Sequence, residues 1–187
     1  MSYLVVDIET VPINAEAAMQ LDDEEQKKLL NPIDSRIVAI GVRKDGVSTI
    51  WCEDDERAML VNFWEAWKTK GPNAPVVGFN IASFDIPFLV TRSFLLDVPV
   101  VPFSVKDVVD LREKLSAYRH GHSRGKLKEF AQLIGLSILD VDGSDVTRLW
   151  TEQRIKELVE YLNRDLEITD ELYARAVRLH LTRIVRW

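Results

Sequence analysis

The sequence is most informative at Tyr3-Leu4-Val5-Val6-Asp7-Ile8-Glu9-Thr10, where an apolar run leads directly into two acids. Carboxylates are almost never fully buried unless they are paired or bind a metal, so two of them in this position need an explanation. Because side chains alternate along a β-strand, Asp7 and Glu9 would point to the same side of the strand, about 6.6 to 7 Å apart. At this spacing two oxygen ligands can hold one divalent cation or flank a pair of cations. The alternative is a strand that ends in solvent and carries two surface acids.

Length and composition indicate one globular domain over residues 1–187. The 187 residues are 47% hydrophobic, enough for a sizeable core, and the net charge of −6 argues against a protein that coats nucleic acid. A metal-dependent nuclease is still compatible with this charge, because bound cations add positive charge where the acids cluster. The single cysteine, Cys52, allows neither an intrachain disulfide nor a Cys-rich zinc site. The chain also shows no secretion signal and no apolar stretch of membrane-spanning length, so we expect a cytoplasmic protein without a membrane partner.

Hydrophobic periodicity and turn signals predict alternating strands and helices. We expect a first strand that begins at Tyr3 and ends with the two acids, and further strands at 36–42, 47–51, 74–79 and 104–111. Helices are expected at 15–30, 84–96, 127–134 and from 151 towards the C-terminus, with another between the acidic run 53–56 and Gly71-Pro72. The acidic runs 22–25 and 53–56 are explained as helix starts. Asp45-Gly46 is a strong hairpin signal, and the order of elements indicates an α/β fold around a mixed sheet.

Two further motifs add acids at positions where ligand sites are common. Asn80-Ile81-Ala82-Ser83-Phe84-Asp85 follows the fourth strand, which places Asp85 at a strand-to-helix junction. Tyr161 and Asp165 are four residues apart and therefore share one face of the last helix, beside its apolar stripe. Taken alone, Asp85 could be a helix N-cap and Asp165 a salt-bridged residue at the rim of the core.

The three motifs together resemble the DEDD, or DnaQ-like, 3′-5′ exonuclease superfamily. The resemblance runs from residue 4 to about 170 and is closest to the proofreading exonuclease domains of family-B DNA polymerases, with their Asn-x-x-x-Phe-Asp and Tyr-x-x-x-Asp motifs. It also extends to bacterial freestanding proteins described as PolB-like predicted exonucleases. The subgroup that uses histidine would need it at position 160, which is Glu here, so the tyrosine (DEDDy) class is favoured. The resemblance implies a ribonuclease H-like fold with a mixed five-stranded sheet flanked by helices, in which strand two is antiparallel to strand one.

The resemblance also implies the residues of the site. The four metal-binding carboxylates would be Asp7, Glu9, Asp85 and Asp165, and Tyr161 would orient the attacking water. Phosphodiester hydrolysis of this kind uses two Mg²⁺ or Mn²⁺ ions about 3.5 to 4 Å apart, which prefer oxygen ligands. We assign Asp7 as the bridging ligand, Glu9 and Asp165 to the ion that activates water, and Asp85 to the second ion through water.

Candidate contacts with nucleic acid lie beside the acids and in a basic segment. Thr10, Asn80 and Phe84 flank the acids; the alternative for Asn80 and Phe84 is that they support their own loop. Residues 112–128 carry six Lys or Arg and one acid, so their charge opposes that of the whole chain. The loop within this segment contains glycines that suit a close approach to phosphates, and its candidate contacts are Arg119, Arg124 and Lys126. An exposed surface loop is the alternative, and a metal pair at His120 and His122 is disfavoured because no other His or Cys lies nearby.

We therefore expect a hydrolase that removes nucleotides from the 3′ end of nucleic acid, with single-stranded DNA as the expected substrate and a role in DNA repair. One alternative is an exoribonuclease that acts on small RNA, because the same site hydrolyses either polymer. The other is a non-catalytic nucleic-acid-binding module, which would be expected to have lost a metal-binding acid, whereas this sequence has lost none. A polymerase or repair complex is the expected protein partner.

Overall fold

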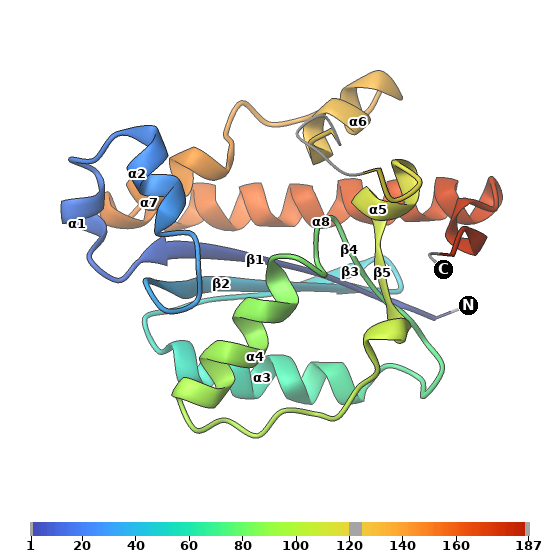
Figure 1. Ribbon diagram of the computed structural model, residues 1–187, viewed down its shortest axis with the longest axis horizontal. Helices are drawn as coiled ribbons and strands as arrows, with labels where there is room; N and C mark the ends of the chain where they lie inside the picture. The colour runs from blue at the N-terminus through green and yellow to red at the C-terminus, as the bar shows by residue number, and fades with distance from the viewer. Residues whose placement is uncertain (1, 120–124, 186–187) are drawn as a thin grey trace.

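The fold is a five-stranded sheet between two layers of helices (Figure 1). The computed structural model describes residues 2–119 and 125–185. The strands lie in the order β3-β2-β1-β4-β5, and their bounds are β1 Leu4–Pro12, β2 Ser35–Lys44, β3 Val47–Cys52, β4 Val76–Gly78 and β5 Val108–Asp110. β1 and β2 are antiparallel, as are β2 and β3, whereas β4 runs parallel to both β1 and β5. This arrangement confirms the predicted mixed sheet, including the antiparallel second strand and β5 at the edge.

The hairpin between β2 and β3 forms at the predicted Asp45-Gly46 pair. Lys44 is opposite Val47, so the loop has two residues, with φ values of 50° for Asp45 and 82° for Gly46. Positive φ at both loop residues matches the right-handed twist of the flanking strands, and Asp-Gly adopts it at low cost.

β1 extends well past the two acids, contrary to the prediction that it would end with them. Its pairing with β2 continues to Pro12, which lies opposite Ser35, and an irregularity falls between Glu9 and Thr10. The acids therefore lie in the middle of a paired strand, opposite a point where β2 contains one extra residue, Val38. The alternative of a strand that ends in solvent is wrong.

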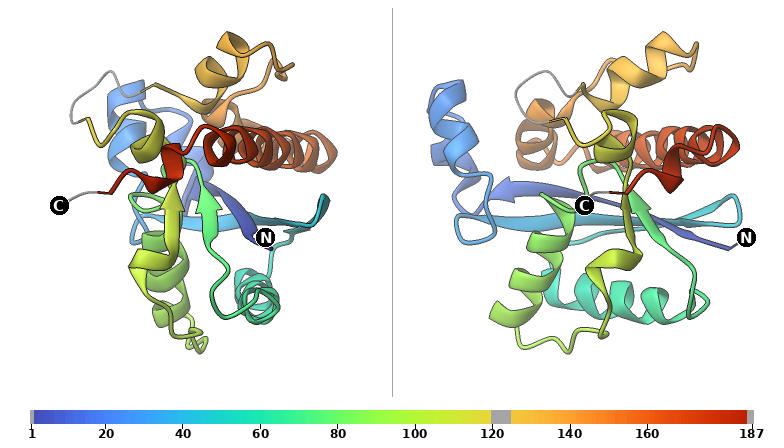
Figure 2. Two further views of the ribbon diagram at one scale, coloured as in Figure 1. Left: turned by 90° about the vertical axis from the view of Figure 1, so that its right-hand side faces the viewer. Right: turned by 45° about the vertical axis from the view of Figure 1, so that its right-hand side comes forward.

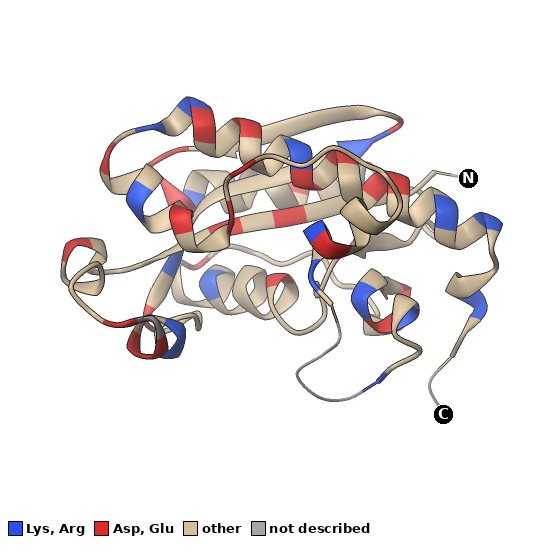
Figure 3. Cartoon of the chain, turned by 90° about the horizontal axis from the view of Figure 1, so that it is seen from above, with Lys and Arg blue, Asp and Glu red and all other residues tan. Residues whose placement is uncertain are grey.

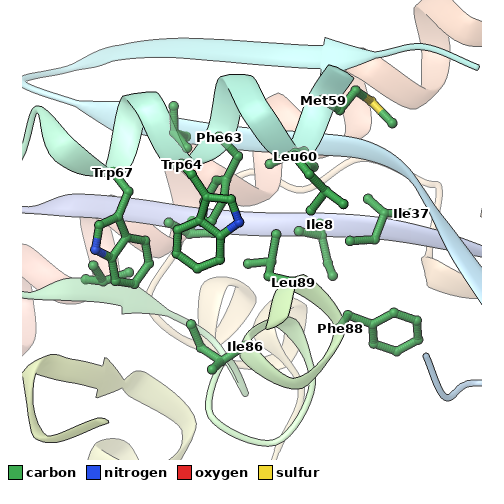
Figure 4. Packing of buried hydrophobic residues seen from close by; sticks show 14 of the residues in the cluster. Ile8, Ile37, Met59, Leu60, Phe63, Trp64, Trp67, Ile86, Phe88 and Leu89 are labelled. Atoms are coloured by element: carbon green, nitrogen blue, oxygen red, sulfur yellow. The ribbon is translucent and has the colours of Figure 1, made fainter. Parts of the chain in front are cut away.

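One face of the sheet is covered by α3 (Glu56–Lys68) and α4 (Asp85–Leu95). Leu4, Val6 and Ile8 of β1 point into this layer and are at most 3% exposed. Figure 4 shows Ile8 between side chains of α3, such as Leu60, and Leu89 of α4. The apolar stripes of the two helices thus bury one side of β1, which leaves its other side for the acids.

The opposite face is covered by α8 (Ile155–Arg178) and by shorter helices above and beside it, as Figure 2 shows. The shorter elements are α1 Ala15–Ala18, α2 Asp23–Lys28, α5 Leu111–Leu115, α6 Leu127–Leu133, α7 Val146–Thr151, and the 3₁₀ turns Gly143–Asp145 and Leu181–Arg183. A further 3₁₀ turn, Val105–Asp107, lies before β5 on the side of α4. α8 lies close against β2, because a Cβ at Gly41 would be only 2.7 Å from Leu166 Cδ1. This close contact holds α8 at a fixed distance from the sheet.

Several predicted elements differ from those observed. The helix expected at 15–30 is two short helices, and the strand expected at 104–111 is limited to Val108–Asp110 after a 3₁₀ turn. The helix expected from Thr151 was also wrong, since Thr151 ends α7 and α8 begins at Ile155. The chain breaks there because Gln153 has a φ of 57°, while the Arg154 N–H bonds back to Leu149 O. This is a typical helix C-terminal turn, which is not visible in the apolar periodicity.

The acidic run 53–56 does more than start a helix. Asp55 is the N-cap of α3, in agreement with a helix start in this run, but Glu56 is buried and its carboxylate pairs with both Nε and Nη2 of Arg92 at 2.8 and 2.7 Å. Glu56 also accepts the Ile37 N–H at 2.8 Å. One buried carboxylate thereby ties α3 to α4 and β2, and loss of one partner of such a pair typically costs about 3 to 5 kcal/mol.

Within the described residues, no helix is both long enough and apolar enough to cross a membrane.

Candidate active site

β1 and α8 bring three acids together on one side of the sheet. Asp7 and Glu9 point from β1 towards α8, whose Asp165 lies one turn after Tyr161. One carboxylate oxygen from each of Asp7, Glu9 and Asp165 lies within 4.8 Å of the others. This convergence follows from two local periodicities, the alternation along β1 and the i, i+4 spacing along α8.

Asp85 joins the cluster from the first turn of α4. It is 2% exposed, and its Oδ1 accepts the Ile8 N–H of β1 at 3.1 Å. The N-cap position of α4 belongs to Phe84, whose side chain has no polar atom to offer, so Asp85 is not the helix cap that its sequence context allowed. Asp85 instead bonds across to the strand that carries Asp7 and Glu9.

The four acids and Tyr161 line one cavity of about 180 Å³. Glu9 and Asp165 are 8% and 6% exposed, whereas Asp7 keeps part of its side chain accessible. The remaining lining residues are Ile8, Phe79, Asn80, Phe84 and Leu127. Four segments far apart in the sequence therefore line a single depression with acidic, apolar and amide side chains.

Burial raises the pKa of all four carboxyl groups, and repulsion within the cluster adds to this effect for Asp7 and Glu9. For Asp7 the pKa is well above its usual range because of burial, followed by the charges of Asp85, Glu9 and Asp165. The pKa of Glu9 is raised by burial first and then by the same kind of repulsion. Burial also raises the pKa of Asp85 to about 7 and that of Asp165 to about 6. Without a bound cation, the cluster thus favours retained protons at neutral pH.

Tyr161 contributes a neutral hydroxyl next to these acids. Its pKa is raised by burial and then by the charges of Glu9, Asp165 and Asp7, and it is hydrogen-bonded to Asp165. The hydroxyl therefore stays protonated and donates to the Asp165 carboxylate. Its oxygen can still accept a hydrogen bond, so the hydroxyl is suited to orient a water molecule beside the cluster.

The cluster fits divalent cations of the hard type. Its donors are carboxylate oxygens, which Mg²⁺ and Mn²⁺ prefer, and three of them already lie within the span of one coordination sphere. The raised pKa values explain why a cation would be bound here, because a cation can replace the protons that otherwise offset four adjacent negative charges. The cluster thus supports binding of divalent metal, whereas the number and identity of the ions remain predictions.

Lys128 is a site residue that the sequence interpretation missed. Its Nζ lies 5.2 Å from the centroid of the Tyr161 ring and donates to Leu139 O at 3.0 Å. Its charge lowers the pKa of Glu9 and of Asp165, against the effect of burial. The sequence placed Lys128 in a basic segment but could not show that this lysine, rather than its neighbours, turns towards the acids.

The predicted nucleic-acid contacts fall into three groups. Asn80 and Phe84 line the cavity, whereas Thr10 is a buried residue of β1 outside its described lining. Arg119 and Lys126 are exposed, with Lys126 at the N-cap position of α6. Arg124 lies outside the described residues, as do His120 and His122.

Basic residues are concentrated at the C-terminal end of the chain. Beyond Glu171 the sequence contains four arginines and no acid. Seen from above in Figure 3, the last turns of α8 and the segment that follows them carry only basic charges. The overall charge of −6 is therefore unevenly distributed.

Comparison with known proteins places this geometry in a family. Residues 16–130 match the family described as DNA polymerase family B, exonuclease domain, which is more than half of the chain. The chain belongs to this family. Residues 101–182 also match the family described as predicted 3′-5′ exonuclease related to the exonuclease domain of PolB. The two matches include Asp85, Tyr161 and Asp165, whereas Asp7 and Glu9 precede them.

Two similar proteins extend the comparison. An uncharacterized protein of Methanocaldococcus jannaschii is 35% identical over 155 residues, which covers 77% of this chain and 87% of that protein. The family B DNA polymerase of the archaeon Pyrobaculum calidifontis is 20% identical with a TM-score of 0.71, over 97% of this chain. The chain spans only a quarter (25%) of that polymerase, so this likeness concerns the fold. The polymerase exonuclease domain has the ribonuclease H-like architecture, and the predicted fold is thereby confirmed.

Proposed function

We propose that this exonuclease-family protein is an active, metal-dependent 3′-5′ exonuclease of the DEDDy type. The observation that carries the proposal is the convergence of Asp7, Glu9, Asp85, Tyr161 and Asp165 on one cavity. A purely structural role would not explain four buried or half-buried acids that repel one another, because such a cluster destabilises the fold. Clusters of this kind are typical of sites whose ligand offsets the repulsion.

The roles of the residues follow from their positions. Asp7, whose carboxyl group interacts with each of the other three acids, would hold both cations, Glu9 and Asp165 would hold the first, and Asp85 would act on the second through water. When bound, Mg²⁺ or Mn²⁺ would lower the pKa of the attacking water and stabilise the charge on the leaving oxygen. Tyr161 would orient the water through its hydroxyl, while Asn80 and Phe84 would contact the terminal nucleotide. The adjacent Lys128 would add positive charge near the phosphate.

Single-stranded DNA is the proposed substrate, and the 3′ end is the proposed point of attack. The exposed Lys126 precedes Leu127 of the cavity wall at the start of α6, and Arg119 and Arg124 belong to the same basic segment of the sequence. Positive charge beside the cavity suits a phosphate backbone that leads to the site.

A polymerase or repair complex is the proposed protein partner, and a cytoplasmic location stays a prediction. An exoribonuclease activity uses the same groups, so RNA is included in the test.

The test is hydrolysis of DNA and RNA oligonucleotides labelled at either end, with Mg²⁺, Mn²⁺ or EDTA. A 3′-5′ exonuclease shortens 5′-labelled strands to a ladder and releases labelled mononucleotide from 3′-labelled strands at once. Asp7→Ala should lower the rate at least about 10³-fold, the scale on which loss of a principal electrostatic group acts. Asp140→Ala removes an exposed acid from a loop and serves as the matched control. Hydrolysis undiminished by EDTA, or a near wild-type rate for Asp7→Ala, would refute the proposal.

A further inference from the structure

A buried carboxylate outside the metal cluster holds the loop that leads to Asp85. Asp110 ends β5, lies beside Gly78 of β4 and is 4% exposed. Its Oδ1 accepts the N–H groups of Asn80, Arg112 and Glu113 at 3.0, 2.9 and 3.3 Å. Its Oδ2 accepts the Ala82 N–H at 3.1 Å. Asp110 thus caps α5 through Oδ1. It also binds two amides of the 80–85 loop, that of Asn80 through Oδ1 and that of Ala82 through Oδ2.

The loop needs this support because its backbone is unusual. Asn80 has a φ of 63°, in the left-handed region, and its carbonyl accepts the N–H groups of Ser83 and Phe84. Ile81 packs so tightly on the preceding strand that a Cβ at Gly78 would be 2.6 Å from the Ile81 Cβ. A left-handed residue followed by a buried anchor allows the chain few ways to reach Asp85. Any shift of the two amides bound to Asp110 therefore moves the start of α4.

Arg112 connects the same loop to the segment before α6. Its Nη1 donates to Asn80 Oδ1 and its Nε to Gly125 O, both at 3.1 Å. Gly125 has a φ of 84°, and a Cβ there would be 2.5 Å from Phe130 Cε2, so this turn accepts only glycine without rearrangement. One planar guanidinium therefore joins the Asn80 side chain, in the cavity lining, to the residue that precedes Lys126.

We propose that Asp110 and Arg112 are positioning residues, which set the place of Asp85 and the side chain of Asn80 in the cavity. Neither touches the reacting atoms. Asp110 acts through the Asn80 and Ala82 amides, and Arg112 acts through the Asn80 side chain and the Gly125 carbonyl. The inference rests on the proposed exonuclease function for its effect on rate, but its effects on metal binding and on the loop amides can be measured separately. The competing explanation is that Asp110 only caps α5.

Asp110→Asn separates the two explanations. The amide oxygen can replace Oδ1 and keep the bonds from Asn80, Arg112 and Glu113, whereas the amide NH₂ replaces Oδ2 and faces the Ala82 N–H, donor against donor. The cap of α5 is retained and the loop bond is lost. Asp55→Asn, at the exposed N-cap of α3, is the matched control for an Asp-to-Asn change at a helix cap.

Three measurements are compared with those of Asp55→Asn. Amide hydrogen exchange should accelerate at least about tenfold at Ala82 while the amides of Arg112 and Glu113 stay protected. Mn²⁺ affinity, followed by electron paramagnetic resonance without substrate, should fall about 10- to 100-fold, the range seen when residues behind metal ligands are changed. The kcat for oligonucleotide hydrolysis should fall by a similar factor with little change in KM, and Asp55→Asn should show none of these effects.

The inference is overturned if Ala82 exchanges faster while Mn²⁺ affinity and kcat equal those of Asp55→Asn, because Asp110 is then only a cap. Unchanged exchange at Ala82 would overturn it as well. If Asp110→Asn does not fold, Arg112→Lys decides, since lysine cannot donate to both Asn80 and Gly125 in one fork. Its control is Arg57→Lys, which alters a similar bridge to the carbonyls of Leu96 and Asp97. Equal Mn²⁺ affinity and kcat for these two lysine variants would refute the role of Arg112.

A failure of the proposed function gives a different pattern. Wild-type protein that binds Mn²⁺ but hydrolyses no oligonucleotide would refute the exonuclease. The positioning role would then be accepted or rejected from amide exchange and Mn²⁺ affinity alone, by the criteria above.

Discussion

The substitution Asp85→Asn should stabilise the metal-free protein at alkaline pH, although it removes a proposed metal-binding acid. Burial raises the pKa of Asp85 from 3.8 to about 7. Because the folded state retains a proton that the unfolded state has lost, stability falls as pH rises between about 4 and 7. The loss is complete above the folded-state pKa. Asparagine has no proton to lose, and its Oδ1 can still accept the Ile8 N–H.

The size of the stability effect follows from the pKa shift of Asp85. At about 1.4 kcal/mol per pKa unit, the ionised Asp85 costs up to about 4 kcal/mol at pH 8 and less than about 2 kcal/mol at pH 5. Urea unfolding in EDTA, followed by tryptophan fluorescence, should therefore show a higher midpoint for Asp85→Asn. With a slope of roughly 2 kcal/mol per M, the increase is about 2 M at pH 8 and under about 1 M at pH 5.

A control variant and the addition of Mn²⁺ test whether the effect comes from the buried Asp85 carboxyl group. Glu171→Gln removes an exposed acid on the same helix as Asp165 and is the control, measured at the same two pH values. Saturating Mn²⁺ should reverse the order at pH 8, because wild type gains the larger binding energy. If Asp85→Asn and wild type unfold at the same urea concentration at pH 8 in EDTA, burial and repulsion do not keep this carboxyl protonated, and the explanation of the cluster is wrong.

Three further predictions concern the rate, the basic segment and the loop. Tyr161→Phe should lower kcat roughly 10- to 10³-fold and leave Mn²⁺ affinity unchanged; a loss of affinity would mean that the hydroxyl supports the metal ligands rather than the water. Replacing Arg119 and Lys126 by Gln should raise KM for oligonucleotides and flatten the salt dependence of binding at constant kcat, and an unchanged KM at two salt concentrations would leave the segment as ordinary surface. Gly78→Ala should lower the free energy of unfolding by about 1 to 3 kcal/mol in a denaturant titration, because the added Cβ overlaps Ile81; full stability would show that the loop can yield.

Much of the fold was predictable because its signals are local. The alternation in β1, the Asp-Gly hairpin and the apolar spacing of α8 each depend on a few neighbouring residues. These signals also put Asp7 and Glu9 on one face of a strand, and Tyr161 and Asp165 on one face of a helix. The failures have local causes too, since the α7–α8 break depends on the left-handed Gln153 rather than on a gap in the apolar pattern.

The interactions between distant segments were not predictable in this way. The bond from Ile8 N–H to Asp85 joins residues 77 positions apart, and the pair between Glu56 and Arg92 joins residues 36 apart. Local patterns assigned both acids to helix starts, and only the packed structure shows what each one accepts. Lys128 is a similar case, because its approach to Tyr161 depends on where α6 lies over α8.

The order of secondary-structure elements, the hairpin between β2 and β3 and the identity of the acids are properties of short stretches of sequence, in which backbone preference and side-chain period suffice. The tertiary structure alone determined that the four acids meet in one cavity and that Asp110 holds the loop behind Asp85. It also determined that mutual burial raises the pKa values of the cluster. The physical reason is that desolvation and Coulomb repulsion depend on distances in space, and these distances exist only after the helices have packed on the sheet.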